Sequence, residues 1–111
     1  MKFLGNIDSP KTTLAVVNVG AVSTNQVADF STKGYFTYTI GGNIQLSVSN
    51  LAVGQRGSLS LLCDGTGRTI SWVGINNWIG GVMPTLTPSK LCVVSLFNDG
   101  VRILASYGTE L

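Results

Sequence analysis

The chain has 111 residues, only 11% of them charged, and a formal net charge of +2. This length fits one domain with a single core and leaves no room for a separate catalytic domain. The charged share is far below the usual value of about 25%, so Ser, Thr, Asn, Gly and apolar side chains must form much of the surface, as in a subunit. The Lys and Arg residues are scattered singly, which argues against a nucleic-acid partner.

The apolar residues and the cysteines exclude further classes of protein. The apolar residues come in short pieces, and none approaches the roughly 20 residues of a membrane helix. Asp8 interrupts the region where a secretory signal would be continuously apolar, so neither membrane insertion nor export is expected. The chain has no His, and Cys63 and Cys92 lack a CxxC partner, so no metal or other cofactor is expected. Both cysteines lie in apolar runs that predict buried free thiols, with a cross-strand bridge as the alternative.

The first 33 residues carry the weakest pattern. Phe3, Leu4 and Ile7 have no evident strand partner, so they are candidates for an arm on a neighbouring subunit or for a terminus packed on its own domain. A first strand is predicted over residues 12–18, and residues 19–33 are expected to form a loop or a short extended arm. We expect residues 1–33 to belong to the same single domain as a β-sandwich core over residues 34–111.

Short segments with alternating apolar and polar residues predict strands along the rest of the chain. In the clearest one, Ile44, Leu46 and Val48 fall on one face and the polar residues between them on the other. Glycine-bearing turns at 41–42, 64–67 and 98–100 predict hairpins. The predicted strands are residues 12–18, 34–40, 43–49, 57–63, 68–73, 91–97 and 101–106, and residues 74–90 are expected to form a long connection.

These patterns predict an all-β fold. No apolar stripe of helical period is free of Gly or Pro, so no helix is expected. Short strands separated by turn residues are typical of two-layer β proteins. The predicted architecture is therefore an antiparallel β-sandwich or jelly-roll-like barrel of about seven to eight strands.

The sequence offers little for catalysis. Without His, a Ser or Cys nucleophile would lack its usual base. The five acidic residues are well separated, and Asp64 and Asp99 occupy turn positions where Asp is favoured for backbone hydrogen bonding alone. Residues 64–69 contain glycines and a cation but precede a predicted strand, whereas a phosphate loop would precede a helix. We expect no enzyme activity and no catalytic residues.

One segment, Trp72 to Trp78, has the composition of a ligand site. Aromatic faces beside the amides of Asn76 and Asn77 could hold a sugar ring by stacking and hydrogen bonding. The alternative is that Trp72 and Trp78 are anchors of the core or of a subunit interface. Both interpretations are kept at this point.

The order of segments from about Gly34 onward resembles a domain of tailed-bacteriophage virion proteins. The resemblance rests on an aromatic and Thr-rich pair of strands, then LAVGQRG at 51–57, DGTGRTISW at 64–72, a Trp-Ile-Gly-Gly connection from Trp78, and Phe97 before an Asn-Asp-Gly turn. Cys63 departs from the polar residue expected before Asp64, and residues 1–33 match nothing in this pattern. Such domains occur in capsid decoration (head-fibre) proteins and in tail-fibre or baseplate tips.

The resemblance implies a homotrimeric virion protein without enzymatic residues. The Met start and short length favour a free-standing capsid decoration protein, which would be made in the bacterial cytoplasm and bind the major capsid protein or another phage structural protein. Residues 1–11 and 74–90 are the expected contact segments. The alternative is a receptor-binding tip that recognises host surface polysaccharide.

Overall fold

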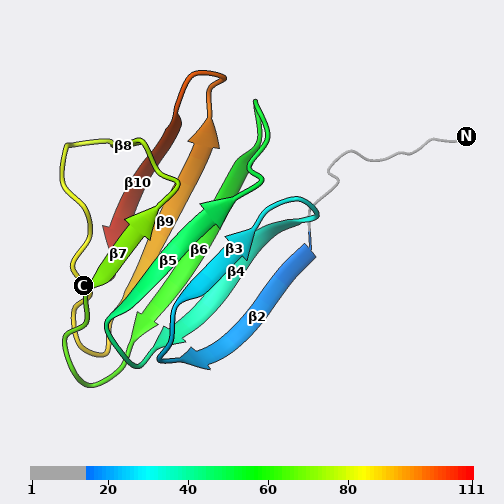
Figure 1. The fold of residues 1–111 in the computed structure, drawn as a ribbon. Coiled ribbons are helices and arrows are strands. Elements are labelled where there is room, and N and C mark those ends of the chain that lie inside the picture. Colours follow the sequence, from blue (N-terminus) through cyan, green and yellow to red (C-terminus); the bar gives the residue numbers. More distant parts are fainter. Residues whose placement is uncertain (1–14) are drawn as a thin grey trace, which may run out of the picture.

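The computed structural model describes residues 15–111, which form an all-β fold without a helix. Two sheets lie one over the other (Figure 1) and enclose a single hydrophobic core. The six-stranded sheet has the order β2-β4-β6-β9-β10-β8, and the three-stranded sheet has the order β3-β5-β7. The strands are β2 (Ala15–Val22), β3 (Gln26–Asp29), β4 (Lys33–Ile40), β5 (Ile44–Ser49), β6 (Arg56–Cys63), β7 (Ile70–Val73), β8 (Asn77–Trp78), β9 (Leu91–Asn98) and β10 (Ile103–Thr109). In this range there is no helix long and apolar enough to cross a membrane.

The first six of these strands wind in three coils. Each coil consists of one strand of the six-stranded sheet followed by one strand of the three-stranded sheet, in the pairs β2 with β3, β4 with β5, and β6 with β7. Corresponding strands of successive coils lie side by side and run parallel, so that Tyr38 pairs with Gly20 on one side and with Leu61 on the other. The three-stranded sheet is parallel as well. This arrangement is that of a short β-solenoid.

The predicted antiparallel sandwich or jelly roll is therefore wrong. Gly41 and Gly42 do not close a hairpin, because β4 and β5 belong to different sheets and neither glycine has a positive φ. Gly42 instead permits close stacking of two corners, since a Cβ there would lie 3.1 Å from the carbonyl oxygen of Ser23. The hairpin predicted at residues 64–67 is likewise a corner between sheets. The turn at residues 98–100 does close a hairpin, between β9 and β10.

The C-terminal hairpin completes the six-stranded sheet. β9 pairs antiparallel with β6 of the third coil, β10 pairs antiparallel with β9, and β8 pairs parallel with β10. The hairpin thus supplies hydrogen-bond partners to the free edge of β6, beside which a fourth coil would otherwise be needed. The fold is a mixed parallel and antiparallel one for this reason.

Two of the described strands lie outside the predicted ones. The region expected to be a loop or arm (19–33) contains the second half of β2 and all of β3, and the connection expected at 74–90 contains β8. β3 carries Ala, Gln and Asp, which have little intrinsic preference for strands. Its position is decided by packing, because Ala28 and the following Phe30 are fully buried.

Inward-facing side chains of both sheets fill the core. Phe30 packs edge-to-face on Phe36, with ring centroids 5.1 Å apart, and so joins the segment after β3 to β4. Each fully buried side chain of this size contributes roughly 1.5–3 kcal/mol relative to an exposed one. The largest of them are Phe30, Ile40, Leu46, Leu59, Leu61, Val94, Cys63 and Cys92.

Asparagine side chains extend the ladders between coils into the corners. The Oδ1 atom of Asn25 accepts a hydrogen bond from the backbone N–H of Gln45 at 2.8 Å, and Asn43 accepts one from Thr69 at 3.0 Å. Each Asn directly precedes a strand of the three-stranded sheet. The side chain thus serves a backbone N–H of the next coil that would otherwise bond to water.

Candidate functional site

Trp72 and Trp78 lie together, but they form a packed cluster. Trp72 on β7 meets Trp78 on β8 edge-to-face at a centroid distance of 5.1 Å, and Trp78 meets Tyr107 on β10 at 6.0 Å. Trp72 and Trp78 pack against the hydrophobic core, whereas Tyr107 is exposed. Edge-to-face packing of partly buried rings stabilises the fold, which favours the interpretation of Trp72 and Trp78 as packing anchors. The Nε1 atom of Trp72 is buried without a hydrogen-bond partner among the described residues.

Asn76 fastens this segment to the sheet. Its Oδ1 atom accepts a hydrogen bond from the backbone N–H of Ile103 at 2.8 Å, and its own N–H donates to the carbonyl oxygen of Ile103 at 3.0 Å. Asn77 lies on β8 opposite Leu104, and its side chain is exposed. Of the two Asn side chains predicted to face a ligand, that of Asn76 therefore has a structural role. The candidate residues Phe3, Leu4 and Ile7 lie outside the described residues.

Two carboxylates shape turns. Asp29 accepts hydrogen bonds from the backbone of Ser31 and the amide of Asn50, and Asp99 accepts two from the backbone of residues 101 and 102. These bonds favour the charged form and lower the pKa of Asp29 and of Asp99 below their ordinary value. A general acid needs a raised pKa, so these groups are suited to structure. No cluster of three metal-ligating side chains occurs within residues 15–111.

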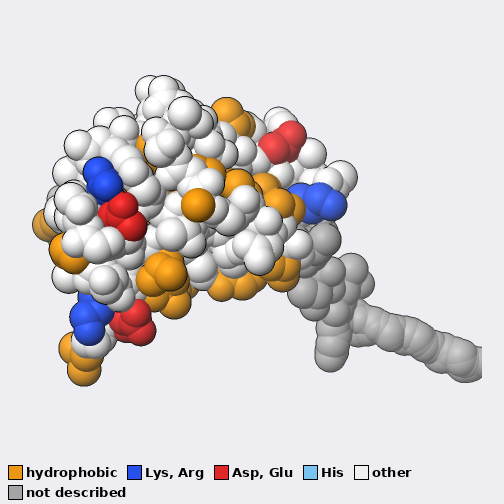
Figure 2. Space-filling view, turned by 90° about the horizontal axis from the view of Figure 1, so that it is seen from below, with side chains coloured by type: hydrophobic (Ala, Val, Ile, Leu, Met, Phe, Trp, Pro, Cys, Tyr) orange, Lys and Arg blue, Asp and Glu red, His pale blue; other side chains and the backbone are white. Residues whose placement is uncertain are grey.

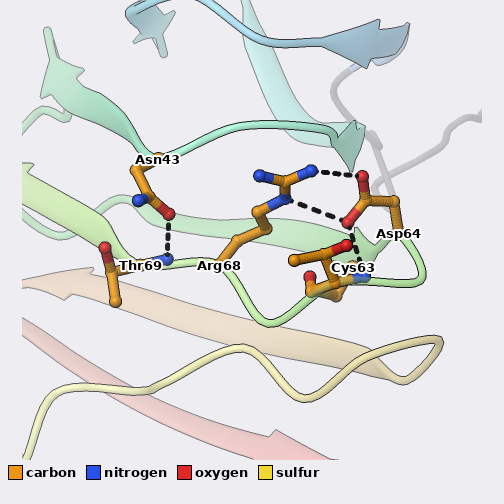
Figure 3. A network of polar contacts seen from close by, with 6 residues as sticks. Asn43, Cys63, Asp64, Arg68 and Thr69 are labelled. Atoms are coloured by element: carbon orange, nitrogen blue, oxygen red, sulfur yellow. Dashed lines mark hydrogen bonds and ion pairs between the residues drawn. The ribbon is translucent and has the colours of Figure 1, made fainter.

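The corner between β6 and β7 holds the shorter of the two ion pairs found within residues 15–111 (Figure 3). Arg68 donates from Nε to Asp64 Oδ1 at 3.0 Å and from Nη2 to Asp64 Oδ2 at 2.8 Å, which is a bidentate contact. Asp64 also accepts a hydrogen bond from the backbone of Thr66. The guanidinium hydrogen bond is the main reason that the pKa of Asp64 is lowered. The loop is thereby closed on itself, with no phosphate cradle and no helix behind it.

Both cysteines are buried and unbridged, which confirms the prediction of free thiols. Cys63 donates a hydrogen bond to the carbonyl oxygen of Thr66 within the same corner. Burial raises the pKa of Cys92 above its ordinary value. The two side chains act as small apolar residues of the core.

Apart from Lys33 and Arg56, which begin β4 and β6, the outer surface of the six-stranded sheet lacks charged side chains across β2, β4, β6 and β9. Facing outward are Asn18, Tyr35, Thr37, Thr39, Ser58, Ser60, Leu62 and Val93, which we call the uncharged face. A continuous cross-strand row within it joins Thr37 to Ser60 and Ser60 to Val93. Thr37 donates to Asn18 at 3.0 Å, and Tyr35 is hydrogen-bonded to Ser60. Many of its polar groups are therefore satisfied within the sheet itself.

Most charged side chains of residues 15–111 lie elsewhere on the molecule. Figure 2 shows charged side chains grouped toward two ends of the view, with apolar and uncharged polar side chains between them. The outer surface of the three-stranded sheet carries Asp29, which is paired with Ser49, and exposed polar residues such as Gln45. The sequence pattern shows alternation in each strand separately. It does not show which strands are neighbours, so the uncharged face could not be recognised from it.

A small hollow adjoins the uncharged face on the same sheet, where the start of β6, the strands β9 and β10, and the residue after β8 meet. It has a volume of about 180 Å³ and contains a guanidinium group, two hydroxyl groups and apolar side chains. Its lining residues are Arg56, Ile79, Ser95, Leu96, Phe97, Leu104, Ala105 and Ser106.

Comparisons with models of known protein families, with curated proteins and with solved structures found no match to this chain. The class that the described residues define is thus an all-β protein of three parallel coils closed by an antiparallel hairpin.

Proposed function

We propose that this chain is a structural subunit of a tailed-bacteriophage virion that associates with copies of itself, as a trimer, and decorates the capsid. The observation that supports self-association is the uncharged face, which spans β2, β4, β6 and β9. The order of sequence segments from Gly34 onward supports the virion setting and the number of three copies. The proposal involves no catalytic step.

The chemistry of the uncharged face suits contact between proteins. Cores of interfaces are depleted in charged residues, since each buried charge must be paired or desolvated at a cost. Leu62 and Val93 expose 39% and 38% of their surface and would gain from burial, at roughly 25 cal/mol per Å². The hydroxyl groups of Tyr35, Thr37 and Ser60 are already bonded to neighbours on the sheet, which reduces the cost of removing water from them.

The mode of action follows from mass action. A subunit that binds only the assembled, folded capsid lattice lowers the free energy of that state and so resists its disassembly. A trimer offers three copies of each contact segment to the lattice, and linked contacts bind more tightly than single ones. Closed symmetry also ends the association at a fixed size, as is usual for soluble homo-oligomers.

The test is the mass of the protein in solution, measured by sedimentation velocity over a range of concentrations. Wild-type protein is expected to sediment with the mass of three chains. Val93→Lys, which places an ammonium group in the uncharged face, is expected to yield single chains. Val73→Lys is the matched control, because Val73 has a similar exposed fraction of 46% but lies on the outer surface of the three-stranded sheet. This variant is expected to remain trimeric.

A wild-type protein that stays a single chain at the highest concentration reached would refute self-association. Equal dissociation of the Val93→Lys and Val73→Lys variants would refute the role of the uncharged face. The virion setting is tested separately by cryo-electron microscopy of intact particles. Density at threefold positions of the capsid supports decoration, whereas density at the tail tip supports the receptor-binding alternative instead.

A further inference from the structure

We infer that the hollow beside Arg56 is a binding site for a carboxylate-bearing sugar, such as a uronic acid unit of a polysaccharide. The hollow adjoins the uncharged face, since Ser95 on β9 is paired with Ser58 on β6. The inference does not rest on self-association, because its test measures sugar binding and not the mass of the protein. It also differs in place from the tryptophan segment.

The hollow exists because two small residues face one another across the sheet. Ser95 on β9 is paired directly with Ser106 on β10, and both side chains point outward. Taller side chains surround this low point, with Phe97 and Leu104 forming the next cross-strand pair and Ile79 lying after the end of β8. The result is a depression with hydroxyl groups on its floor and apolar walls.

Arg56 gives the hollow its charge preference. Its guanidinium lies over the ring of Phe97, 4.7 Å from the centroid, and this contact holds a flexible side chain in place. Arg68 and Arg102 each pair with an aspartate, but within residues 15–111 no carboxylate pairs with Arg56. An oriented guanidinium without an anionic partner is suited to a carboxylate ligand.

The other groups favour a sugar over an acidic peptide side chain. An ionised Asp or Glu side chain has no hydrogen-bond donor. With its carboxylate bound to Arg56, it could donate nothing to the hydroxyl oxygens of Ser95 and Ser106. A uronic acid offers hydroxyl groups to Ser95 and Ser106 and C–H groups to Ile79 and Leu104. The volume of about 180 Å³ is below that of drug-sized sites, which suits one sugar unit of a longer chain.

The experiment is a titration of isotopically labelled full-length protein followed by amide chemical shifts. Glucuronate is the probe, glucose is the neutral sugar with the same ring, and glutarate is a carboxylate without hydroxyl groups. Glucuronate is expected to shift the amides of Ser95, Ser106 and Ile79 in a saturable way. Glucose and glutarate are each expected to bind about tenfold more weakly, as loss of one charge-assisted or two neutral hydrogen bonds would produce.

Two variants test the site without removing core residues. Arg56→Gln keeps a polar side chain and is expected to weaken glucuronate binding at least about tenfold, since a hydrogen bond to a charged group contributes roughly 1.5–3 kcal/mol. Ser106→Leu fills the hollow, keeps Arg56 and is expected to abolish binding. Arg68→Gln, at the opposite end of β6, removes one guanidinium elsewhere and is expected to leave the affinity unchanged.

Three results would overturn the inference. Absence of saturable shifts with glucuronate removes the site, and equal weakening in Arg56→Gln and Arg68→Gln reduces it to a general charge effect. Binding of glutarate as tight as that of glucuronate would show that the hollow recognises carboxylates alone, as an acidic peptide would supply, and not a sugar.

Discussion

At the scale of single residues, polar side chains in this protein mostly hold turns and corners. Asp64 is an example that the sequence allowed us to predict, because Asp followed by Gly in a turn favours local backbone hydrogen bonding. The bidentate contact between Asp64 and Arg68 could not be predicted from this turn pattern. It depends on how the six residues of this corner fold back between two sheets.

The lowered pKa of Asp64 predicts a dependence of stability on pH. The unfolded-state value is close to 3.8 and the folded-state value is lower, so the stabilisation is complete above the unfolded value and is lost as the pH falls through the folded value. Asp64→Asn is therefore expected to lower Tm at neutral pH and to show a smaller fall in Tm than wild type between about pH 5 and pH 2.

Thermal unfolding followed by circular dichroism across this pH range measures the difference. The background variant Arg68→Gln provides the control, because Asp64→Asn should have a smaller effect once the guanidinium is gone. If wild type and Asp64→Asn lost the same amount of stability on acidification, the ion pair would not be the cause.

The tryptophan segment shows how far residue types lead without structure. The sequence singles out Trp72 and Trp78, and the two interpretations, ligand platform and packing anchor, differ in the orientation of the rings. Orientation is set by β7, β8 and β10 together, three strands whose neighbourhood no local pattern reveals. Arg56 and Ser106, which are 50 residues apart in sequence, drew no attention for the same reason.

At the scale of elements, strand positions were largely predictable and strand partners were not. Alternation over Ile44–Ser49 identifies β5 and its buried face correctly. A hairpin from β4 to β5 was nevertheless predicted, because glycines between two strands commonly close one. Glycine is also required where two backbones approach closely, and Gly42 serves that second purpose against Ser23. The two uses look the same in one sequence.

The asparagine corners lead to a prediction about stability. Asn43→Ala removes the hydrogen bond to the backbone N–H of Thr69 and is expected to lower the free energy of unfolding by about 1 kcal/mol, the net contribution of a typical hydrogen bond. Asn25→Ala is expected to have a similar effect through Gln45. Urea unfolding measures both.

Asn77→Ala is the matched control for these variants. Asn77 is exposed on β8, and its side chain makes no hydrogen bond recorded among residues 15–111. Its replacement is expected to change the free energy of unfolding by less than about 0.5 kcal/mol. Equal effects at Asn77 and Asn43 would mean that the corners do not depend on their side-chain hydrogen bonds.

At the scale of the whole molecule, the coils make stability depend on position. β6 has hydrogen-bonded neighbours on both sides, β4 and β9, whereas β2 is bonded to β4 alone among the described strands. In stacked repeats each unit is stabilised mainly by the units next to it, so the terminal coil opens most readily.

Native-state hydrogen exchange measures this gradient. The amides of β2 that bond to β4 are expected to exchange roughly tenfold or more faster than those of β6, because local opening costs less free energy than global unfolding. Comparable rates for β2 and β6 would indicate a single all-or-none opening and would contradict a stepwise loss of coils.

A consequence for the evolution and engineering of the chain follows from the way the coils pair. The second coil receives two parallel ladders from the first and passes two on to the third, while the terminal hairpin needs only the free edge of β6. Insertion or deletion of one complete coil leaves both the pairing between coils and the pairing with the hairpin intact. Shorter changes alter the pairing of every strand that follows, so viable length variants should differ by whole turns.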